Sequence, residues 1–405
     1  MTTGFIAVMV GFTSSAVLVF QAATSAGASP DQISSWLFAL GLSIGLPCIG
    51  LSYYYRMPIL IGWSTPGAAL LATSLSGFSM PEAIGAFVFS AILTILSGVS
   101  GLFERALSHV PRALTSAMLA GILLHFGLNV FAAMQDQFLL IFSLFIIYLI
   151  GKRYFTRYVI LIVLIGGIVM ARLNGTFDLN QVHLALSSPI LTFPVFTISS
   201  IISIGIPLFI VTMTSQNVPG IAILNASNYR LPISPVISWI GLSSLLFAPF
   251  GCYSISLTAL TAAICTSEEA DTNPKHRYKS TIFGGLCWLT IGIFGSTVVA
   301  LFSAFPQALI ISIAGLALFS TIGSSLKAAL EEESQREPAI ITVLVSASGL
   351  SLFGIGGAFW GLTSGIIASI ILNWRPRNQT IQSELNLPLP NMSSIESANK
   401  TLDPG

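Results

Sequence analysis

The sequence predicts an all-α polytopic membrane protein with 14 transmembrane segments, arranged as a 7+7 inverted repeat. Three observations lead to this fold class: an apolar composition, a one-sided distribution of basic residues, and a motif that recurs seven spans later. The chain of 405 residues has a mean hydropathy of +0.87, with 54% hydrophobic and 8% charged residues. Since soluble domains contain about 25% charged residues, most of this chain is expected to lie in the bilayer.

Apolar stretches long enough to cross a bilayer, about 20 residues each, follow one another along most of the chain. A longer connection is predicted at 174–198, and the polar residues 374–405 are predicted to form a disordered cytoplasmic tail. The third and tenth spans are predicted to be broken helices with short extended segments. The predicted spans are 4–26, 32–54, 59–76, 82–101, 112–133, 137–150, 157–173, 199–225, 232–248, 251–266, 277–302, 306–326, 338–354 and 356–373.

The basic residues test this count. With the N-terminus in the cytoplasm and alternating spans, Arg172 alone of the 16 Lys and Arg residues falls outside. The positive-inside rule predicts this distribution for a correct topology. Both termini are therefore predicted to be cytoplasmic, in a multi-pass membrane protein.

A short motif recurs and defines the repeat. Val110–Leu114 (VPRAL) opens the fifth span and Phe305–Leu309 (FPQAL) opens the twelfth. The two motifs lie seven spans apart, and because seven is odd the two halves are predicted to be inverted in the membrane. The broken third and tenth spans are then repeat mates. Paired interrupted spans indicate the binding site of a secondary transporter.

The third span, Ile59–Leu71 (ILIGWSTPGAALL), is predicted to be extended up to Ser64 or Thr65. A half-helix follows, with that hydroxyl residue as N-cap and Pro66 at its first position. In the tenth span a second half-helix is predicted to begin near Ser254. Helix N-termini bind anions through free N–H groups, so the pair predicts a cradle for a small organic anion. The alternative is that both prolines only kink ordinary helices.

Polar and aromatic residues near these breaks are the candidate ligands. Gln216 and Asn217 in the eighth span either bind a carboxylate or join helices, since buried amides need partners. Gln21 lies either near the site or near the outer end of its helix, and aromatic candidates either contact a ring or pack. The candidate substrate-binding residues are Phe20, Gln21, Trp63, Ser64, Thr65, Gly67, Gln216, Asn217, Gly251, Tyr253 and Ser254.

Several classes of protein are not indicated. The four cysteines form no CxxC pair, the sequence has no HExxH or Walker A motif, and no nucleophile elbow is expected. We therefore expect no enzyme, no ATP-driven pump, no metal or other cofactor and no nucleic-acid partner. His125, alone in its span, is more often packing than a proton relay. Glu82 lies at the outer end of its span.

The motifs resemble the benzoate transporter (BenE) family over about 4–376. That resemblance implies benzoate–proton symport and an architecture similar to uracil permeases and sulfate transporters, with a core domain moving against a gate domain. Tyr253 and Ser256 stand where family members often have His and Asn. The similar stretches are Gly11–Ala16, Phe20–Ala23, Gly62–Leu71, Thr214–Gly220, Ala248–Gly251 and Thr261–Cys265.

The resemblance assigns 1–104 and 191–303 to the core domain, and 105–190 and 304–373 to the gate domain. It implies import of benzoate or a related aromatic carboxylate, with the proton moving on Glu82 or on the substrate itself, and a homodimer. The related nucleobase permeases have a carboxylate where this chain has Gln216, which suits an anionic substrate here. The alternatives are an anion channel or exchanger of the same fold, a nucleobase permease, and a membrane sensor.

Overall fold

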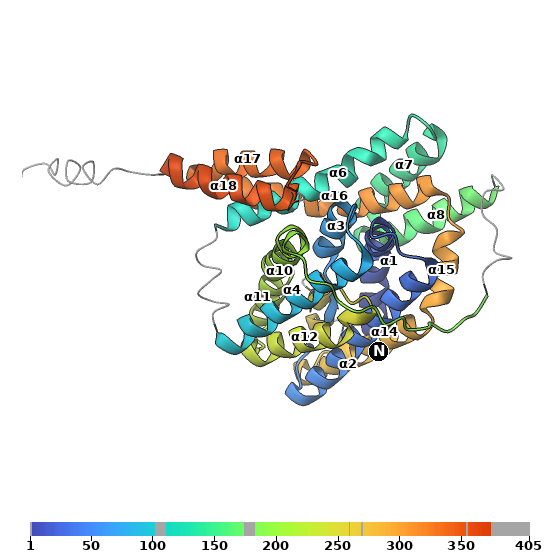
Figure 1. Cartoon of the computed structure of the whole chain (residues 1–405). Coiled ribbons are helices and arrows are strands. Elements are labelled where there is room, and N and C mark those ends of the chain that lie inside the picture. The colour runs from blue at the N-terminus through green and yellow to red at the C-terminus, as the bar shows by residue number, and fades with distance from the viewer. Residues whose placement is uncertain are drawn as a thin grey trace, which may run out of the picture.

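The computed structural model describes residues 2–101, 111–173, 183–258, 260–268, 270–353 and 355–373. The predicted tail, 374–405, lies outside this part. The described chain is mostly helical (Figure 1). It also contains two short antiparallel ribbons. The main helices are α1 (Thr2–Ser25), α2 (Pro30–Tyr55), α3 (Thr65–Ser74), α4 (Met80–Ser100), α6 (Arg112–Ala133), α7 (Phe138–Tyr154), α8 (Val159–Leu173), α10 (Ile206–Thr212), α11 (Val218–Ala226), α12 (Ile233–Phe247), α13 (Leu260–Thr266), α14 (Tyr278–Ile293), α15 (Gly295–Ser303), α16 (Gln307–Leu330), α17 (Arg336–Ala347) and α18 (Gly357–Asn373).

Seven helices in the described part are long and apolar enough to cross a bilayer, and α14 with α15 adds an eighth if that bent pair is one span. The helical membrane fold is confirmed, whereas the count of 14 spans stays a prediction. The predicted eleventh span, 277–302, contains a break that the sequence did not indicate. It bends by 67° between α14 and α15. Ser187 stabilises the break, since its N–H donates to Ile293 O and its hydroxyl to Gly292 O.

The helices form two packed groups. The α6 group comprises α6–α8 and α16–α18, which lie in the upper part of Figure 1. The α2 group comprises α1–α4 and α10–α15, with α2 against α14, α4 against α12 and α1 against α3. The groups meet where α1 contacts α16 and α8, and where α3 and α10 contact α6.

Glycines allow the helices of the α2 group to approach closely. A Cβ built on Gly41 of α2 would lie 2.5 Å from Cα of Gly292 in α14. A Cβ on Gly4 of α1 would lie 1.9 Å from the carbonyl oxygen of Ser280. Close contact of small residues is the usual basis of helix packing in membranes, where hydrophobic burial gives little drive.

A ribbon joins the third and tenth segments. Strand β1 (Ile61–Trp63) pairs antiparallel with β2 (Ile255–Leu257), with Gly62 opposite Ser256. Outside the strands, the N–H of Ser64 donates to Ser254 O and that of Thr258 to Leu60 O. A second ribbon, β3 (Ser351–Leu352) with β4 (Ile355–Gly356), connects α17 to α18.

The start of the second half-helix differs from the prediction. Residues after Ser254 form β2, and α13 begins only at Leu260, so no helix starts near Ser254. The physical reason is the pairing with β1, which extends Ile255–Leu257. With 7 residues, α13 is also shorter than α3, which has 10.

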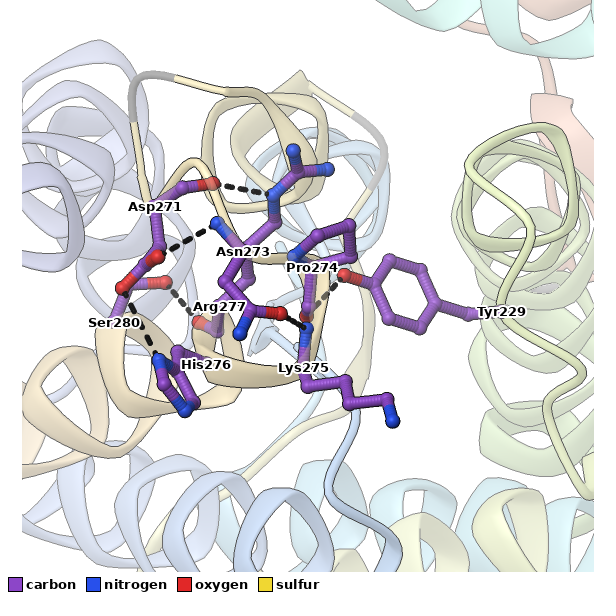
Figure 2. Close-up of polar contacts among 8 residues, drawn as sticks. All are labelled: Tyr229, Asp271, Asn273, Pro274, Lys275, His276, Arg277 and Ser280. Carbon is purple, nitrogen blue, oxygen red and sulfur yellow. Dashed lines mark hydrogen bonds and ion pairs between the residues drawn. The ribbon is translucent and has the colours of Figure 1, made fainter.

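A loop closes the end of α13 and is drawn in Figure 2. Arg277 is 9% exposed, and its guanidinium donates to the carbonyl oxygens of Thr266, at the end of α13, and of Asp271. The hydroxyl of Tyr229, from the turn before α12, donates to Pro274 O at 2.8 Å. Burial raises the pKa of Tyr229 although Arg277 acts to lower it. The loop therefore joins α13 to α14 and to the turn before α12.

Replacing Arg277 with Met is expected to lower the unfolding temperature of the purified protein in detergent. The change leaves the carbonyl oxygens of Thr266 and Asp271 without this donor, which costs about 1–3 kcal/mol for buried groups. Lys279→Met, at an exposed position two residues on, is the matched control and should leave the temperature unchanged. Equal unfolding temperatures for the two variants would contradict this role of Arg277.

Candidate functional site

A cavity of about 380 Å³ lies between the two helix groups, and we call it the central cavity. The α2 group contributes α1, β1, the first turn of α3, the turn before α11, α13 and Trp288 of α14, and the α6 group contributes α6 and α16. Its volume is in the range of small-molecule sites. The polar and aromatic residues that line it are Ser14, Ser15, Trp63, Thr65, Ser215, Gln216, Thr258, Thr261, Trp288, Ser320, Thr321 and Ser324.

The central cavity adjoins a second space of about 690 Å³, the Lys152 vestibule. The two share Ser14 of α1 and Ala317 and Ser320 of α16 in their linings. Lys152, at the end of α7, also lines the vestibule. By the predicted topology this residue is cytoplasmic, so the central cavity adjoins the predicted cytoplasmic side.

Two tryptophans form an aromatic wall of the central cavity. The ring centroids of Trp63 and Trp288 are 4.7 Å apart at an interplanar angle of 69°, and Phe12 contacts both rings. The indole N–H of Trp63 donates to Ser15 Oγ at 2.7 Å, which fixes the orientation of the ring. Such a wall presents an edge and a face to an incoming aromatic ring.

The N-terminus of α3 reaches this cavity, but most of its N–H groups are already used. Of the two predicted N-cap residues, Ser64 and Thr65, Ser64 is the N-cap. Pro66 lies at the second helical position and not, as predicted, at the first. The N–H of Gly67 donates to Ser64 Oγ and that of Ala68 to Ser64 O, while Pro66 has none. Thr65 keeps its backbone N–H and its hydroxyl without a partner within the described ranges. Of the backbone N–H groups predicted to bind an anion at the start of α3, only that of Thr65 is therefore free within the described ranges.

The adjacent amides Gln216 and Asn217 have different environments. The eighth helix contains a π-helical turn at Met213–Asn217, in which the N–H of Val218 donates to Met213 O. Gln216 lines the central cavity, and its amide has no partner in the part of the chain that the structure describes. Asn217 is fully buried, accepts from the N–H of Leu257 at 2.9 Å and donates to Met213 Sδ. Its hydrogen bonds fit the alternative interpretation, that it holds the interrupted segments.

Three other predicted site residues lie behind the cavity wall. The hydroxyl of Tyr253 donates to Ser64 O at 3.2 Å, and Ser254 Oγ donates to Thr212 Oγ1, which itself donates to Ser64 Oγ. Gly251 has φ +105°, and a Cβ there would lie 1.9 Å from Cδ1 of Trp36. Together these residues hold Ser64 and β2 in place instead of lining the central cavity.

Phe20 and Gln21 line a separate cavity of about 680 Å³, which we call the Gln21 cavity. It lies towards the end of α1 at Ser25, away from the Lys152 vestibule, which is lined by Phe5 and Met9. Of the predicted candidates, the structure therefore brings Trp63, Thr65 and Gln216 together at the central cavity.

Sequence reasoning missed Trp288, Ser215 and the hydroxyls of α16. The α16 residues had a visible signal, since Ser320, Thr321 and Ser324 recur on one face of an apolar helix. Trp288 had none, because one tryptophan in an apolar span is usually packing. Within the described ranges, the lining of the central cavity contains no charged side chain or histidine, and no cluster of His, Cys, Asp and Glu could hold a metal.

Comparisons with known proteins agree on a transporter. The family model described as "Benzoate membrane transport protein" (BenE) matches residues 1–371. The chain is 45% identical to "Inner membrane protein YdcO" of Escherichia coli (strain K12) over 370 residues, which is 91% of this chain and 95% of that protein. It is 36% identical to the "Benzoate membrane transport protein" of Acinetobacter baylyi (strain ATCC 33305 / BD413 / ADP1) over 369 residues, 91% of this chain and 94% of that one.

Two solved structures are similar in fold at 11% sequence identity. The transmembrane domain of the cyanobacterial bicarbonate transporter BicA has a TM-score of 0.58, with 91% of this chain and 96% of that chain covered. SLC26A9 has a TM-score of 0.55, with 92% of this chain and 65% of that chain covered.

The two adjacent amides are expected to respond differently to replacement by Leu. Asn217→Leu leaves the buried N–H of Leu257 without its acceptor and should cost about 1–3 kcal/mol of stability. Gln216→Leu removes no hydrogen bond that the described structure contains, and is the matched control. Thermal unfolding in detergent measures both, and an equal loss of stability in the two variants would contradict the assignment.

Proposed function

The chain belongs to the benzoate membrane transport protein (BenE) family, and from this premise we propose that it imports benzoate or a related aromatic carboxylate across the bacterial inner membrane. It is a multi-pass membrane transporter and not an enzyme. The observation that supports this substrate most directly is the central cavity, because one wall is aromatic and the other offers unpaired hydrogen-bond donors.

In the proposed complex the ring lies against Trp63 and Trp288, and the carboxylate lies at Thr65 and Gln216. Thr65 offers its backbone N–H and hydroxyl, and Gln216 offers its amide N–H₂. The positive end of the α3 dipole adds attraction for a negative charge. Hydroxyl and amide donors can recognise a carboxylate, and the described lining of the cavity contains no Lys or Arg. The substrate would therefore dissociate more easily than from an ion pair with Arg.

The proposed mechanism is a movement of the α2 group, as the core domain, against the α6 group, as the gate domain. The central cavity lies between these groups, so their relative displacement would change which side of the membrane it faces. The β1–β2 ribbon and the bonds of Asn217 tie the substrate-binding segments into the α2 group. In this proposal the predicted homodimer would hold the gate domains still.

Gln216→Leu and Thr65→Val are expected to weaken uptake of radiolabelled benzoate by proteoliposomes. A lost hydrogen bond to a charged group costs about 1.5–3 kcal/mol, or about 10- to 150-fold in affinity, and Thr65→Val should lose less because its N–H remains. Thr290→Val is the matched control, since its hydroxyl donates within α14 to Leu286 O.

Unchanged uptake in Gln216→Leu would remove this residue from the site. Uptake that requires internal substrate would favour the exchanger, single-channel currents would favour the channel, and competition by uracil would favour the nucleobase permease. No uptake of any of these compounds by the wild-type protein would favour the sensor.

The proposal includes a coupled proton that travels with the substrate. Glu82, the other option, accepts from the N–H and the hydroxyl of Ser79 at 2.9 and 2.7 Å in the capping box of α4. Its carboxylate is thus engaged in holding a helix end, which favours the option that the proton crosses the membrane on the substrate itself.

A pH gradient that is acidic outside is expected to accelerate benzoate uptake, because the proton gradient then drives inward the benzoate and the proton that crosses with it. A protonophore should abolish the acceleration. Protein-free liposomes must be measured in parallel, since neutral benzoic acid also crosses lipid unaided. If uptake by the protein exceeds that of protein-free liposomes but does not change with the pH gradient, proton coupling is wrong.

A further inference from the structure

The Gln21 cavity has the composition of a second ligand site. It lies between α1, the end of α3, α6 and the N-terminal half of α16, where the two helix groups meet. On α6 its lining residues include His125 and Asn129, which are one turn apart on one face. On α16 they include Gln307, the first residue of the helix.

Its polar groups divide into paired and unpaired ones. The hydroxyls of Thr24 and Ser25 donate to the carbonyl oxygens of Phe20 and Ala72 and are therefore used within the protein. The side chains of Gln21, His125, Asn129 and Gln307 have no hydrogen-bond partner within the ranges that the structure describes. The buried hydroxyl of Ser346, which also lines the cavity, likewise lacks one there.

These groups favour an anion. Amide N–H₂ groups and an imidazole N–H all donate to a carboxylate, and the described lining contains no Asp or Glu. The N-terminus of the 24-residue α16 also faces this space, with the partial positive charge of its dipole.

The floor of the cavity favours an aromatic ring. Phe20 and Phe302 stack with their centroids 4.4 Å apart and an interplanar angle of 15°. Phe302 also lies 6.4 Å from Phe12, which contacts Trp63 and Trp288 of the central cavity. A continuous series of aromatic rings thus connects the two cavities.

The two cavities lie end to end along the same helices. On α6, Ile122 lines the Gln21 cavity and the next residue, Leu123, lines the central one. On α16, Ala314 lines the first and Ala317 the second, about one helical turn apart. The stacked rings of Phe20 and Phe302 therefore lie between the Gln21 cavity and the aromatic wall of the central cavity.

We propose that the Gln21 cavity is a second binding site for aromatic carboxylates, on the entry side of the transport path. The inference rests on the proposed function for its substrate class. In this site Gln21, Asn129 and Gln307 bind the carboxylate and the Phe20–Phe302 stack binds the ring. A carboxylate bound in the Gln21 cavity lies next to the central cavity, and the Phe20–Phe302 stack separates the two cavities.

Equilibrium binding of radiolabelled benzoate to the purified full-length chain in detergent tests this directly. Wild-type protein should bind two molecules, and Gln216→Leu should keep the one in the Gln21 cavity. The double variant Gln21→Leu/Asn129→Leu should keep the central one and lose at least ten-fold in affinity for the other. If the double variant does not fold, Asn129→Asp keeps the size of the side chain and repels a carboxylate, so it gives the same answer.

A thiol-protection experiment locates the second molecule. Ser303→Cys places a thiol in the lining of the Gln21 cavity, in a Cys287→Ser and Gln216→Leu background, and benzoate should slow its modification several-fold. Gln135→Cys, exposed beyond the end of α6, is the matched control and should not be protected.

The outcomes separate the two proposals. One bound molecule that is lost in Gln216→Leu, with no protection at position 303, overturns the second site and leaves the proposed function intact. Protection of the Ser303→Cys thiol by benzoate, combined with no transport of any aromatic acid by the wild-type protein, would leave the second site standing and overturn the proposed function.

Discussion

The hydrogen bonds of Ser64 are the constraint on which the central cavity depends. Its N–H donates to Ser254 O, its hydroxyl accepts from Gly67 and Thr212, and its carbonyl accepts from Ala68 and Tyr253. One small residue thereby holds the start of α3 against β2 and the eighth helix. Because Ser64 is fully buried, these hydrogen bonds are not exchanged for bonds to water, and they hold the start of α3 rigidly next to Thr65, which lines the central cavity.

This arrangement separates residues that shape the site from residues that face it. Tyr253, Ser254 and Asn217 use their polar groups on other parts of the protein, whereas those of Thr65 and Gln216 line the central cavity and have no partner within the described ranges. A buried polar group is costly unless it is paired, so unpaired donors beside an open cavity are informative about function. The same contrast between used and unused donors distinguishes the Gln21 cavity.

Local chemistry made part of this structure predictable. The Ser64 N-cap and the extended approach to it follow from residue types within a few positions of one another. The strand at Ile255–Leu257 could not be predicted, because it forms by pairing with β1, almost two hundred residues away. Trp288 and the break after α14 depend on packing with distant segments in the same way. The core and gate division and the inverted topology remain predictions.

The π turn at Met213–Asn217 has a consequence for how this site could diversify. A π turn contains one residue more than an α-helical turn, and one residue corresponds to about 100° of helical rotation. Loss of that residue would rotate Gln216 away from the cavity while leaving the helix on either side intact. Selectivity could therefore change through a single-codon deletion, without any substitution, in descendants that keep the same fold.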